Sequence, residues 1–162
     1  MNLTPHLPAY LAGSYGWDFA LSIDGGGEEE KGSKMAIRRA TATVTGATGG
    51  AGVATAFAYT DKPVDGEVIG VHLAYQDSPP GATTDVSIIE ANNSPAQTVL
   101  TISNAATDGW FYPLAAGVNQ AGAAITNSGR PIKVSDTLKV TITGANNGDG
   151  VIATIVYDDL RG

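Results

Sequence analysis

The chain has 162 residues, of which 43% are apolar and 15% are charged, and its formal net charge is −7. This length predicts one domain that buries roughly 70% of the surface its unfolded chain would expose, and the composition excludes a charge-rich disordered protein. Nine Lys and Arg against 16 Asp and Glu argue against nucleic-acid binding, which needs clustered positive charge.

Three further absences narrow the class of protein. The chain has no cysteine, which excludes disulfides, thiolate catalysis and Cys-ligated zinc. No stretch approaches the ~20 apolar residues of a membrane-spanning helix, so we expect no membrane partner. The beginning of the chain lacks the basic and apolar regions of a signal peptide. We therefore expect a soluble protein that is synthesised in a cytoplasm.

Residues 1–34 differ in composition from the rest of the chain. They contain Tyr10, Tyr15, Trp17 and Phe19, followed by a run of glycines, glutamates and lysines at Gly25–Lys34 that is typical of a flexible linker or loop. The aromatic segment is too short to form a core of its own. It therefore packs as a first strand on its own domain, on a neighbouring subunit, or on a partner surface. We assign residues 1–34 to an N-terminal arm with a linker, and residues 35–162 to one β domain.

Alternation of apolar and polar residues, interrupted by clusters of turn residues about every ten positions, predicts strands along the whole β domain. A central stretch from Gly117 to Gly129 is small and polar and shows no helical stripe. The expected strands are Met35–Thr45, Val53–Tyr59, Glu67–Gln76, Asp85–Ala91, Thr98–Ser103, Asp108–Ala116, Arg130–Val134, Thr137–Thr143 and Val151–Asp158.

The last two of these strands flank Gly144–Gly150, whose residues favour a chain reversal, and we expect them to form a closing β-hairpin. Pro113 interrupts the aromatic strand and indicates a sheet edge or a bulge. With eight to ten strands and no helix, the fold class is all-β. We expect an antiparallel β-sandwich of jelly-roll type with an extended N-terminal arm, and a small β-barrel is the alternative.

The segment Thr45–Gly52, TGATGGAG, matches the glycine-rich turn TGxxxGxG of short-chain dehydrogenases, where a dinucleotide meets a helix N-terminus. The strand before it carries Arg38 and Arg39, whereas a central parallel strand is buried on both faces. The residues after it are β-branched and aromatic and soon reach Pro63, so a helix is not expected there. We interpret the segment as a glycine-rich hairpin loop, and a nucleotide-binding enzyme remains the weakest alternative.

Other candidate sites also favour a protein without catalysis. His72 faces solvent or a subunit interface, and the chain has no G-x-S-x-G elbow for a hydrolase. Asn146–Gly150 lacks the late Glu of an EF-hand and is expected to be a tight turn. Trp110 and Tyr112 share one strand face, and an exposed pair there would support a carbohydrate-binding module. We expect no catalytic residue, no cofactor and no metal site.

The C-terminal third, from DGWFYPLA at Asp108–Ala115 to RPIKVSDTLKVTITGANNGDGVIATIVYDD at Arg130–Asp159, resembles small virion proteins of tailed bacteriophages. In those proteins a W-Y-P strand, a P-x-x-V-x-D-x-L-x-V strand pair and a G-D-x-V hairpin close a compact β domain. The resemblance implies a protein that decorates or cements a capsid shell, often as a homotrimer, with the major capsid protein as its partner and the virion as its location. The alternative is a carbohydrate-binding or receptor-binding module of a phage head or tail fibre.

Overall fold

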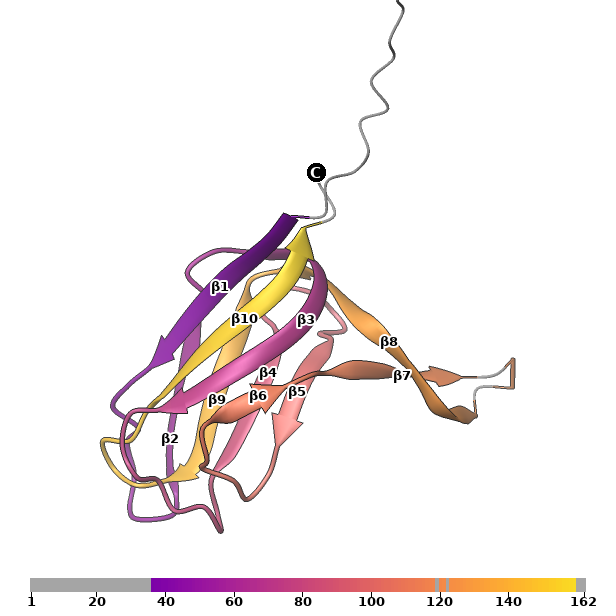
Figure 1. Ribbon diagram of the computed structural model, residues 1–162. Helices are drawn as coiled ribbons and strands as arrows, with labels where there is room; N and C mark the ends of the chain where they lie inside the picture. The colour runs from indigo at the N-terminus through magenta and orange to yellow at the C-terminus, as the bar shows by residue number, and fades with distance from the viewer. Residues whose placement is uncertain (1–35, 119, 122, 160–162) are drawn as a thin grey trace, which may run out of the picture. The chain divides into compact units, whose positions relative to one another are not determined.

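The computed structural model describes residues 36–118, 120–121 and 123–159, which form ten β-strands and no helix (Figure 1). The strands are β1 (Ala36–Val44), β2 (Ala54–Tyr59), β3 (Val64–Tyr75), β4 (Asp85–Glu90), β5 (Thr98–Ile102), β6 (Gly109–Phe111), β7 (Leu114–Val118), β8 (Ala124–Asp136), β9 (Leu138–Ala145) and β10 (Val151–Asp159). The all-β prediction is confirmed.

The strands form two antiparallel sheets that pack face to face. The first sheet has the order β1-β10-β3-β8-β7, with β6 also paired to β3, and the second has the order β2-β9-β4-β5. β6 and the second half of β8 share one edge of β3, because Val71–Leu73 pairs with β6 and Val64–Val68 pairs with β8. Two separate sheets make a β-sandwich, so the alternative of a small barrel is wrong.

The pairing of the strands is nested along the chain. β1 pairs with β10, β2 with β9, β3 with β6 and β8, and β4 with β5. The chain thus behaves as one long antiparallel hairpin that is rolled up so that successive pairs lie in alternate sheets. This strand order is that of a jelly roll, as expected from the sequence.

The expected closing hairpin is wrong. β9 pairs with β2 and β4, whereas β10 pairs with β1 and β3, so the turn between them crosses from one sheet to the other. The glycine-rich loop at Thr45–Gly52 is likewise a corner between sheets, joining β1 to β2. The Ala47 N–H donates to the Asp149 carbonyl, and the Gly148 N–H donates to the Ala47 carbonyl. These two backbone hydrogen bonds join the two corners to each other.

The core lies between the inner faces of the two sheets and is aliphatic. β10 alternates buried residues at odd positions with half-buried residues at even positions as far as Tyr157. β9 alternates in the same way from Leu138 to Ile142. The largest fully buried side chains are Leu73, Ile88, Leu138, Ile142 and Ile155. This alternation is the pattern that the sequence predicts for strands with one face on a core.

The region between Asp108 and Asp136 differs most from the expected strands. Pro113 divides the aromatic strand into β6 and β7, as a residue without an N–H would. β8 has 13 residues and begins within the stretch that we did not assign to a strand. Its second half pairs with β3, and its first half leaves the sheet and pairs with β7. We call β7 and residues 124–131 of β8 the projecting hairpin, because Figure 1 shows them extending away from both sheets.

Asp136 ties the end of β8 to the loop between β4 and β5. Its carboxylate accepts hydrogen bonds from the Asn92 N–H and side-chain amide, both at 2.6 Å, from the Thr137 N–H at 2.7 Å and from the Asn93 N–H at 3.1 Å. Burial acts to raise the pKa of Asp136, but these donors favour the charged form more strongly and leave the pKa below its ordinary value. Asp136 therefore positions this corner of the sandwich.

The aromatic residues assigned to the arm, Tyr10, Tyr15, Trp17 and Phe19, lie outside the described residues. The described chain begins with β1, which is an edge strand of the first sheet. The backbone of Thr41, in the middle of this edge, is engaged by Asp61. The Thr41 N–H donates to the Asp61 carboxylate, and the Asp61 N–H donates to the Thr41 carbonyl, both at 2.8 Å. This contact blocks the centre of the edge against pairing with another strand.

Candidate functional site

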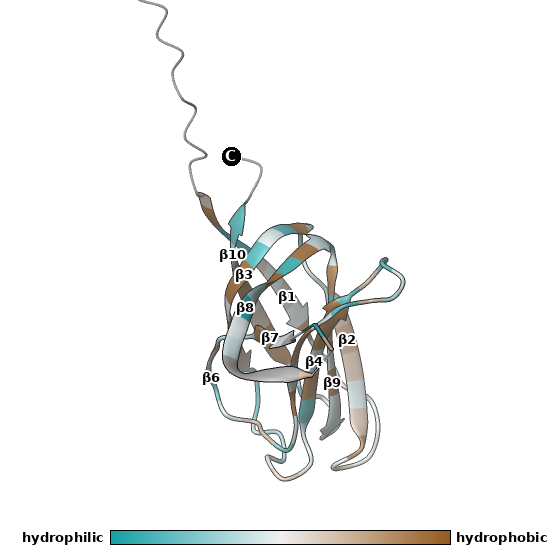
Figure 2. Cartoon of the chain, turned by 90° about the vertical axis from the view of Figure 1, so that its right-hand side faces the viewer, coloured by the Kyte–Doolittle hydropathy of each residue, from teal (hydrophilic) through white to brown (hydrophobic). Residues whose placement is uncertain are grey.

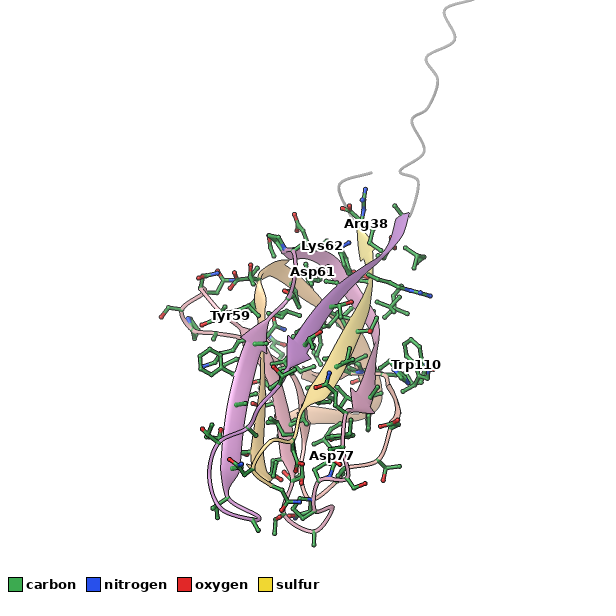
Figure 3. All side chains as sticks on the ribbon, turned by 90° about the vertical axis from the view of Figure 1, so that its left-hand side faces the viewer. Arg38, Tyr59, Asp61, Lys62, Asp77 and Trp110 are labelled. Atoms are coloured by element: carbon green, nitrogen blue, oxygen red, sulfur yellow. The ribbon has the colours of Figure 1, made fainter. Side chains whose placement is uncertain are left out.

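The outer faces of the sandwich carry most of the aromatic side chains in the described residues. Phe57, Tyr59, Trp110 and Tyr112 are exposed, whereas Tyr157 is buried. Buried aromatic rings usually dominate the energetics of a core, but here aliphatic side chains fill that role. Tyr59 and Trp110 lie on opposite sides of the sandwich (Figure 3). The exposed rings therefore form two separate surfaces.

The first of these surfaces lies on the outer face of the first sheet, and we call Ile69, His72, Trp110 and Tyr112 the Trp110 surface. Trp110 pairs with His72 across β6 and β3, and the centroids of the two rings are 5.0 Å apart. Trp110 is 50% exposed and Tyr112 is 69% exposed, whereas Phe111 between them packs against the core. The two sequence-predicted residues are thus both exposed, Trp110 within β6 and Tyr112 directly after its end.

A β-bulge brings Ile69 to this surface. Tyr157 opposes Val68 and Val156 opposes Gly70, so Ile69 has no partner residue on β10. The extra residue turns the Ile69 side chain outward, where it is 42% exposed. Strict alternation along the expected strand Glu67–Gln76 predicts that Ile69 shares one face with Val71 and Leu73. That prediction is wrong, because alternation alone does not reveal a bulge.

The Tyr112 ring packs against the backbone of Gly70. A Cβ atom on Gly70 would stand only 3.4 Å from two carbons of the Tyr112 ring, so the ring lies directly over the glycine backbone.

The loop before β6 is fixed by Tyr75. Its N–H donates to the Asp108 carboxylate at 2.8 Å, and its hydroxyl donates to the Ala105 carbonyl at 3.1 Å. Burial, followed by the Asp108 charge, raises the pKa of Tyr75, so the hydroxyl keeps its proton as a donor.

The projecting hairpin begins directly after the Trp110 surface. Leu114, its first residue, is 59% exposed and pairs with Pro131. Its side chain lies against Gly129, where a Cβ atom would come within 2.6 Å of the leucine. Figure 2 looks onto the side to which the hairpin extends, and the bend of β8 there is drawn in mostly pale colours. Arg130 is the single charged residue between Leu114 and Pro131. The hairpin is therefore an almost uncharged element on an acidic protein.

The second aromatic surface lies on the outer face of the second sheet, and we call Phe57, Tyr59 and Lys139 the Phe57 surface. Phe57 and Tyr59 meet edge to face with ring centroids 5.8 Å apart, and the Lys139 ammonium lies 4.3 Å from the centroid of Phe57. Both rings are more than half exposed, because β2 turns its alanines toward the core. Sequence reasoning assigned these residues to a strand but did not consider them as a site, although the aromatic and alanine faces were distinct.

A hollow of about 570 Å³ lies between β3, β8 and the loop that joins β4 to β5. Its charged side chains are already engaged. Lys133 pairs with Glu67 at 3.3 Å, and Glu90 accepts a hydrogen bond from the Gln97 N–H at 3.1 Å. Asp65, Glu90 and Lys133 are its charged lining residues. None of the sequence-predicted site residues lines this hollow, so we do not assign it a function.

The glycine-rich segment Thr45–Gly52 does not lead into a helix. Thr48 and Thr55 form an antiparallel bridge, and the chain continues into β2. A dinucleotide-binding turn needs a helix N-terminus at this position, so the geometry of that family is not present here.

In the turn at Asn146–Gly150, the Asn146 N–H donates to the Asp149 carboxylate at 2.6 Å, and Asp149 is buried. The expectation of a tight turn is confirmed.

Within residues 36–118, 120–121 and 123–159, no three His, Asp or Glu side chains gather where they would hold a metal ion. The same part of the chain contains no helical segment of the length and hydrophobicity that crossing a bilayer requires. Comparison with known proteins found no family model, no curated protein and no solved structure that matches the chain.

Proposed function

We propose that this chain is a structural protein of a tailed bacteriophage, which decorates and stabilises the capsid shell without catalysis. Its partners are other copies of itself, most simply in a homotrimer, and the major capsid protein. It is made in the host cytoplasm and resides on the surface of the virion. The observation that carries this proposal is the exposure of Phe57, Tyr59, Trp110 and Tyr112 on the two outer faces of the sandwich.

Exposed aromatic surfaces are the expected signature of a protein that works by contact. Large apolar side chains grouped on the outside of a soluble domain mark sites of association, and Tyr and Trp are enriched at such sites. Two such surfaces on opposite faces allow one molecule to contact two neighbours at once. That arrangement suits a protein that links copies of itself to one another and to a shell.

The jelly roll and the resemblance of residues 108–159 to virion proteins support the same proposal. The jelly roll recurs in capsid and lectin domains. The N-terminal aromatic segment adds a second means of attachment in this proposal. From Phe19 to Ala36 an extended chain of 17 residues reaches roughly 55–60 Å, at about 3.3–3.6 Å per residue. In this proposal Tyr10, Tyr15, Trp17 and Phe19 dock on a neighbouring subunit or on the shell.

Co-sedimentation with empty capsid shells tests this function. The intact chain is expected to pellet with shells, and both a chain lacking residues 1–24 and the double variant Phe57→Ser/Tyr59→Ser are expected to pellet less. Exposed Thr55→Ala on the same strand is the matched control. Intact protein that stays in the supernatant at every protein concentration contradicts the proposal. A truncated chain that binds as well as the intact one contradicts the role of the arm alone.

The exposed Trp110–Tyr112 pair favours a second candidate function, a carbohydrate-binding or receptor-binding module. Aromatic rings at alternate positions on an outer strand face offer a flat platform on which a sugar ring stacks. The chain has two tryptophans, Trp17 and Trp110, so the variant Trp17→Phe leaves Trp110 as the only indole. A change in its fluorescence on titration with glycans selected on an array supports this function, and the absence of any binding on the array contradicts it.

A further inference from the structure

We propose that the projecting hairpin of one copy packs on the Trp110 surface of the next copy, so that the copies close into a ring of three. This inference rests on the proposed function in that the protein acts as a homo-oligomer of three chains. It identifies the two surfaces that meet and the direction of the contact.

The projecting hairpin is not a stable element by itself. β7 is the last strand of its sheet and pairs with β8 alone, and the first half of β8 pairs with β7 alone. A two-stranded hairpin is marginally stable in water unless a third strand or another packing surface supports it. Ala115 near its base packs against the core of the sandwich, whereas Figure 1 shows the hairpin extending away from both sheets of its own chain. A second molecule can supply the support that the extended part of the hairpin lacks.

The hairpin also lacks the features that keep exposed strands apart. Natural edge strands are commonly protected by charges, above all lysine, or by contacts that block pairing. β1 has such a contact in Asp61, which occupies the backbone of Thr41. From Leu114 to Pro131 the chain has one charged residue, Arg130, and no carboxylate. This composition suits an element that is covered in the assembled protein.

Electrostatic repulsion between copies favours an approach through the part of the chain that has no carboxylate. Each chain carries a formal charge of −7, so two copies carry a net electrostatic repulsion. The hairpin is a long stretch without a carboxylate, and its one charge is positive. It can therefore approach an acidic neighbour without like-charge repulsion. This complementarity favours a second copy of the same chain as the occupant.

The Trp110 surface has the properties of the acceptor. Ile69, Trp110 and Tyr112 are each more than 40% exposed, on the outer face of a rigid sheet. Aromatic rings of this kind supply most of the free energy of many protein interfaces. The surface and the hairpin are different parts of one chain, so each copy both offers a hairpin and accepts one. Such a head-to-tail contact generates a ring when the rotation between copies closes.

Light scattering on the full-length chain, without shells, tests the contact. The unaltered protein is expected to have the mass of three chains. The acceptor variant Trp110→Ser/Tyr112→Ser and the hairpin variant Ala116→Asp/Ala123→Asp are each expected to have the mass of one chain. Thr55→Ala, at an exposed residue on the opposite face, is the control and keeps the three-chain mass. The far-ultraviolet circular dichroism spectrum of each variant is expected to match that of the unaltered protein, which shows that each is folded.

Mixing the two broken variants identifies the direction of the contact. The acceptor variant still has an intact hairpin, and the hairpin variant still has an intact Trp110 surface, so one good contact remains and a two-chain complex is expected. If hairpins instead pair with hairpins, the acceptor variant associates with itself and the hairpin variant stays a single chain, and the proposed contact is overturned. It is equally overturned if the acceptor variant keeps the three-chain mass or if the unaltered protein is a single chain. A single chain whose Trp110 fluorescence responds to glycans assigns the surface to carbohydrate instead.

Failure of this inference and failure of the proposed function are distinguishable. A protein that forms the ring but does not pellet with shells contradicts the capsid function and leaves the contact between copies standing. A protein that pellets with shells as single chains does the reverse.

Discussion

The sandwich and the projecting hairpin are built from the same kind of strand but are stabilised in opposite ways. In the sandwich each strand has a covered inner face, and β10 at its centre is flanked by β1 and β3. In the hairpin, β7 and the first half of β8 pair with each other alone, and Ala115 near its base packs against the core. The two regions therefore differ both in the number of partners that each strand has and in burial. The comparison separates the part of the molecule that its own two sheets cover from the part that we propose packs on a neighbouring copy.

Hydrogen exchange gives the largest expected contrast between these regions. In the single-chain variant Trp110→Ser/Tyr112→Ser, the amide hydrogens of β10 are expected to exchange only when the whole domain unfolds. Those of β7 are expected to exchange through local opening of the hairpin. A difference of about 4 kcal/mol between these processes corresponds to roughly 1000-fold faster exchange in β7. In the unaltered oligomer the β7 amides are expected to be protected. Equal protection of β7 and β10 in the single chain would contradict this account of the hairpin.

Two leucines compare the regions by free energy of unfolding. Leu73 is fully buried between the sheets, and its replacement by alanine is expected to cost about 2–5 kcal/mol in urea denaturation. Leu114 is 59% exposed at the start of the hairpin, and Leu114→Ala is expected to change the stability of the single chain by less than about 0.5 kcal/mol. A large loss from Leu114→Ala would mean that the hairpin belongs to the folding unit of the sandwich.

Asp136 sharpens the comparison at the point where β8 joins the sandwich. Asp136→Asn removes the charge that accepts four hydrogen bonds and is expected to cost about 1–3 kcal/mol at pH 7. Because the pKa of Asp136 in the folded protein lies below its ordinary value of 3.8, its contribution is fully present above that pH and is lost as the pH falls through the lower folded value.

Denaturation series between pH 7 and pH 2 check this prediction. The unaltered protein is expected to lose stability below about pH 4 more steeply than Asp136→Asn. Asp77→Asn is the control, since Asp77 is exposed and its carboxylate accepts a bond from the neighbouring Ser78 N–H. Parallel pH profiles for the unaltered protein and Asp136→Asn would show that this carboxylate does not stabilise the corner.

The smallest expected effect concerns the edge of β1. Asp61→Ala removes the acceptor of the Thr41 N–H and is expected to cost about 0.5–1 kcal/mol, because this hydrogen bond is exposed. The variant also opens the centre of an edge strand, so light scattering is expected to detect slow association into irregular larger species. Lys62→Ala, at the next residue, is the control. A variant that stays as dispersed as the unaltered protein would show that β1 is protected by other means.

The sequence was sufficient to predict the sandwich because each inner face carries its own alternation. Leu138, Val140 and Ile142 are buried on the predicted face of β9. The sequence was not sufficient to predict which strands pair with each other. β9 and β10 are adjacent along the chain and joined by a glycine-rich turn, yet they lie in different sheets. A chain reversal within a sheet and a corner between sheets use the same residue types, so local pattern does not distinguish them.

The surfaces were less predictable than the core, for two physical reasons. Ile69 reaches the outer face through a bulge, which depends on the register between β3 and β10. Phe57 and Tyr59 are exposed because the alanines of β2 face the core, and sequence alone does not say which of two apolar faces turns inward. Trp110 and Tyr112 were predictable as a pair, since they alternate with Phe111 along a strand. The start of β8 was missed because its small residues carry no alternation.

The pairing of the first described strand with the last has a practical consequence for fusions. Ala36 lies directly opposite Asp159 in the register of β1 and β10, so the polypeptide enters and leaves the domain at a single point. A peptide joined after Asp159 would therefore emerge beside the start of β1. Linking Asp159 to Ala36 through a short tether and opening the chain in a loop elsewhere would preserve every strand, which makes the domain a natural frame for circular permutation and for displaying paired cargo.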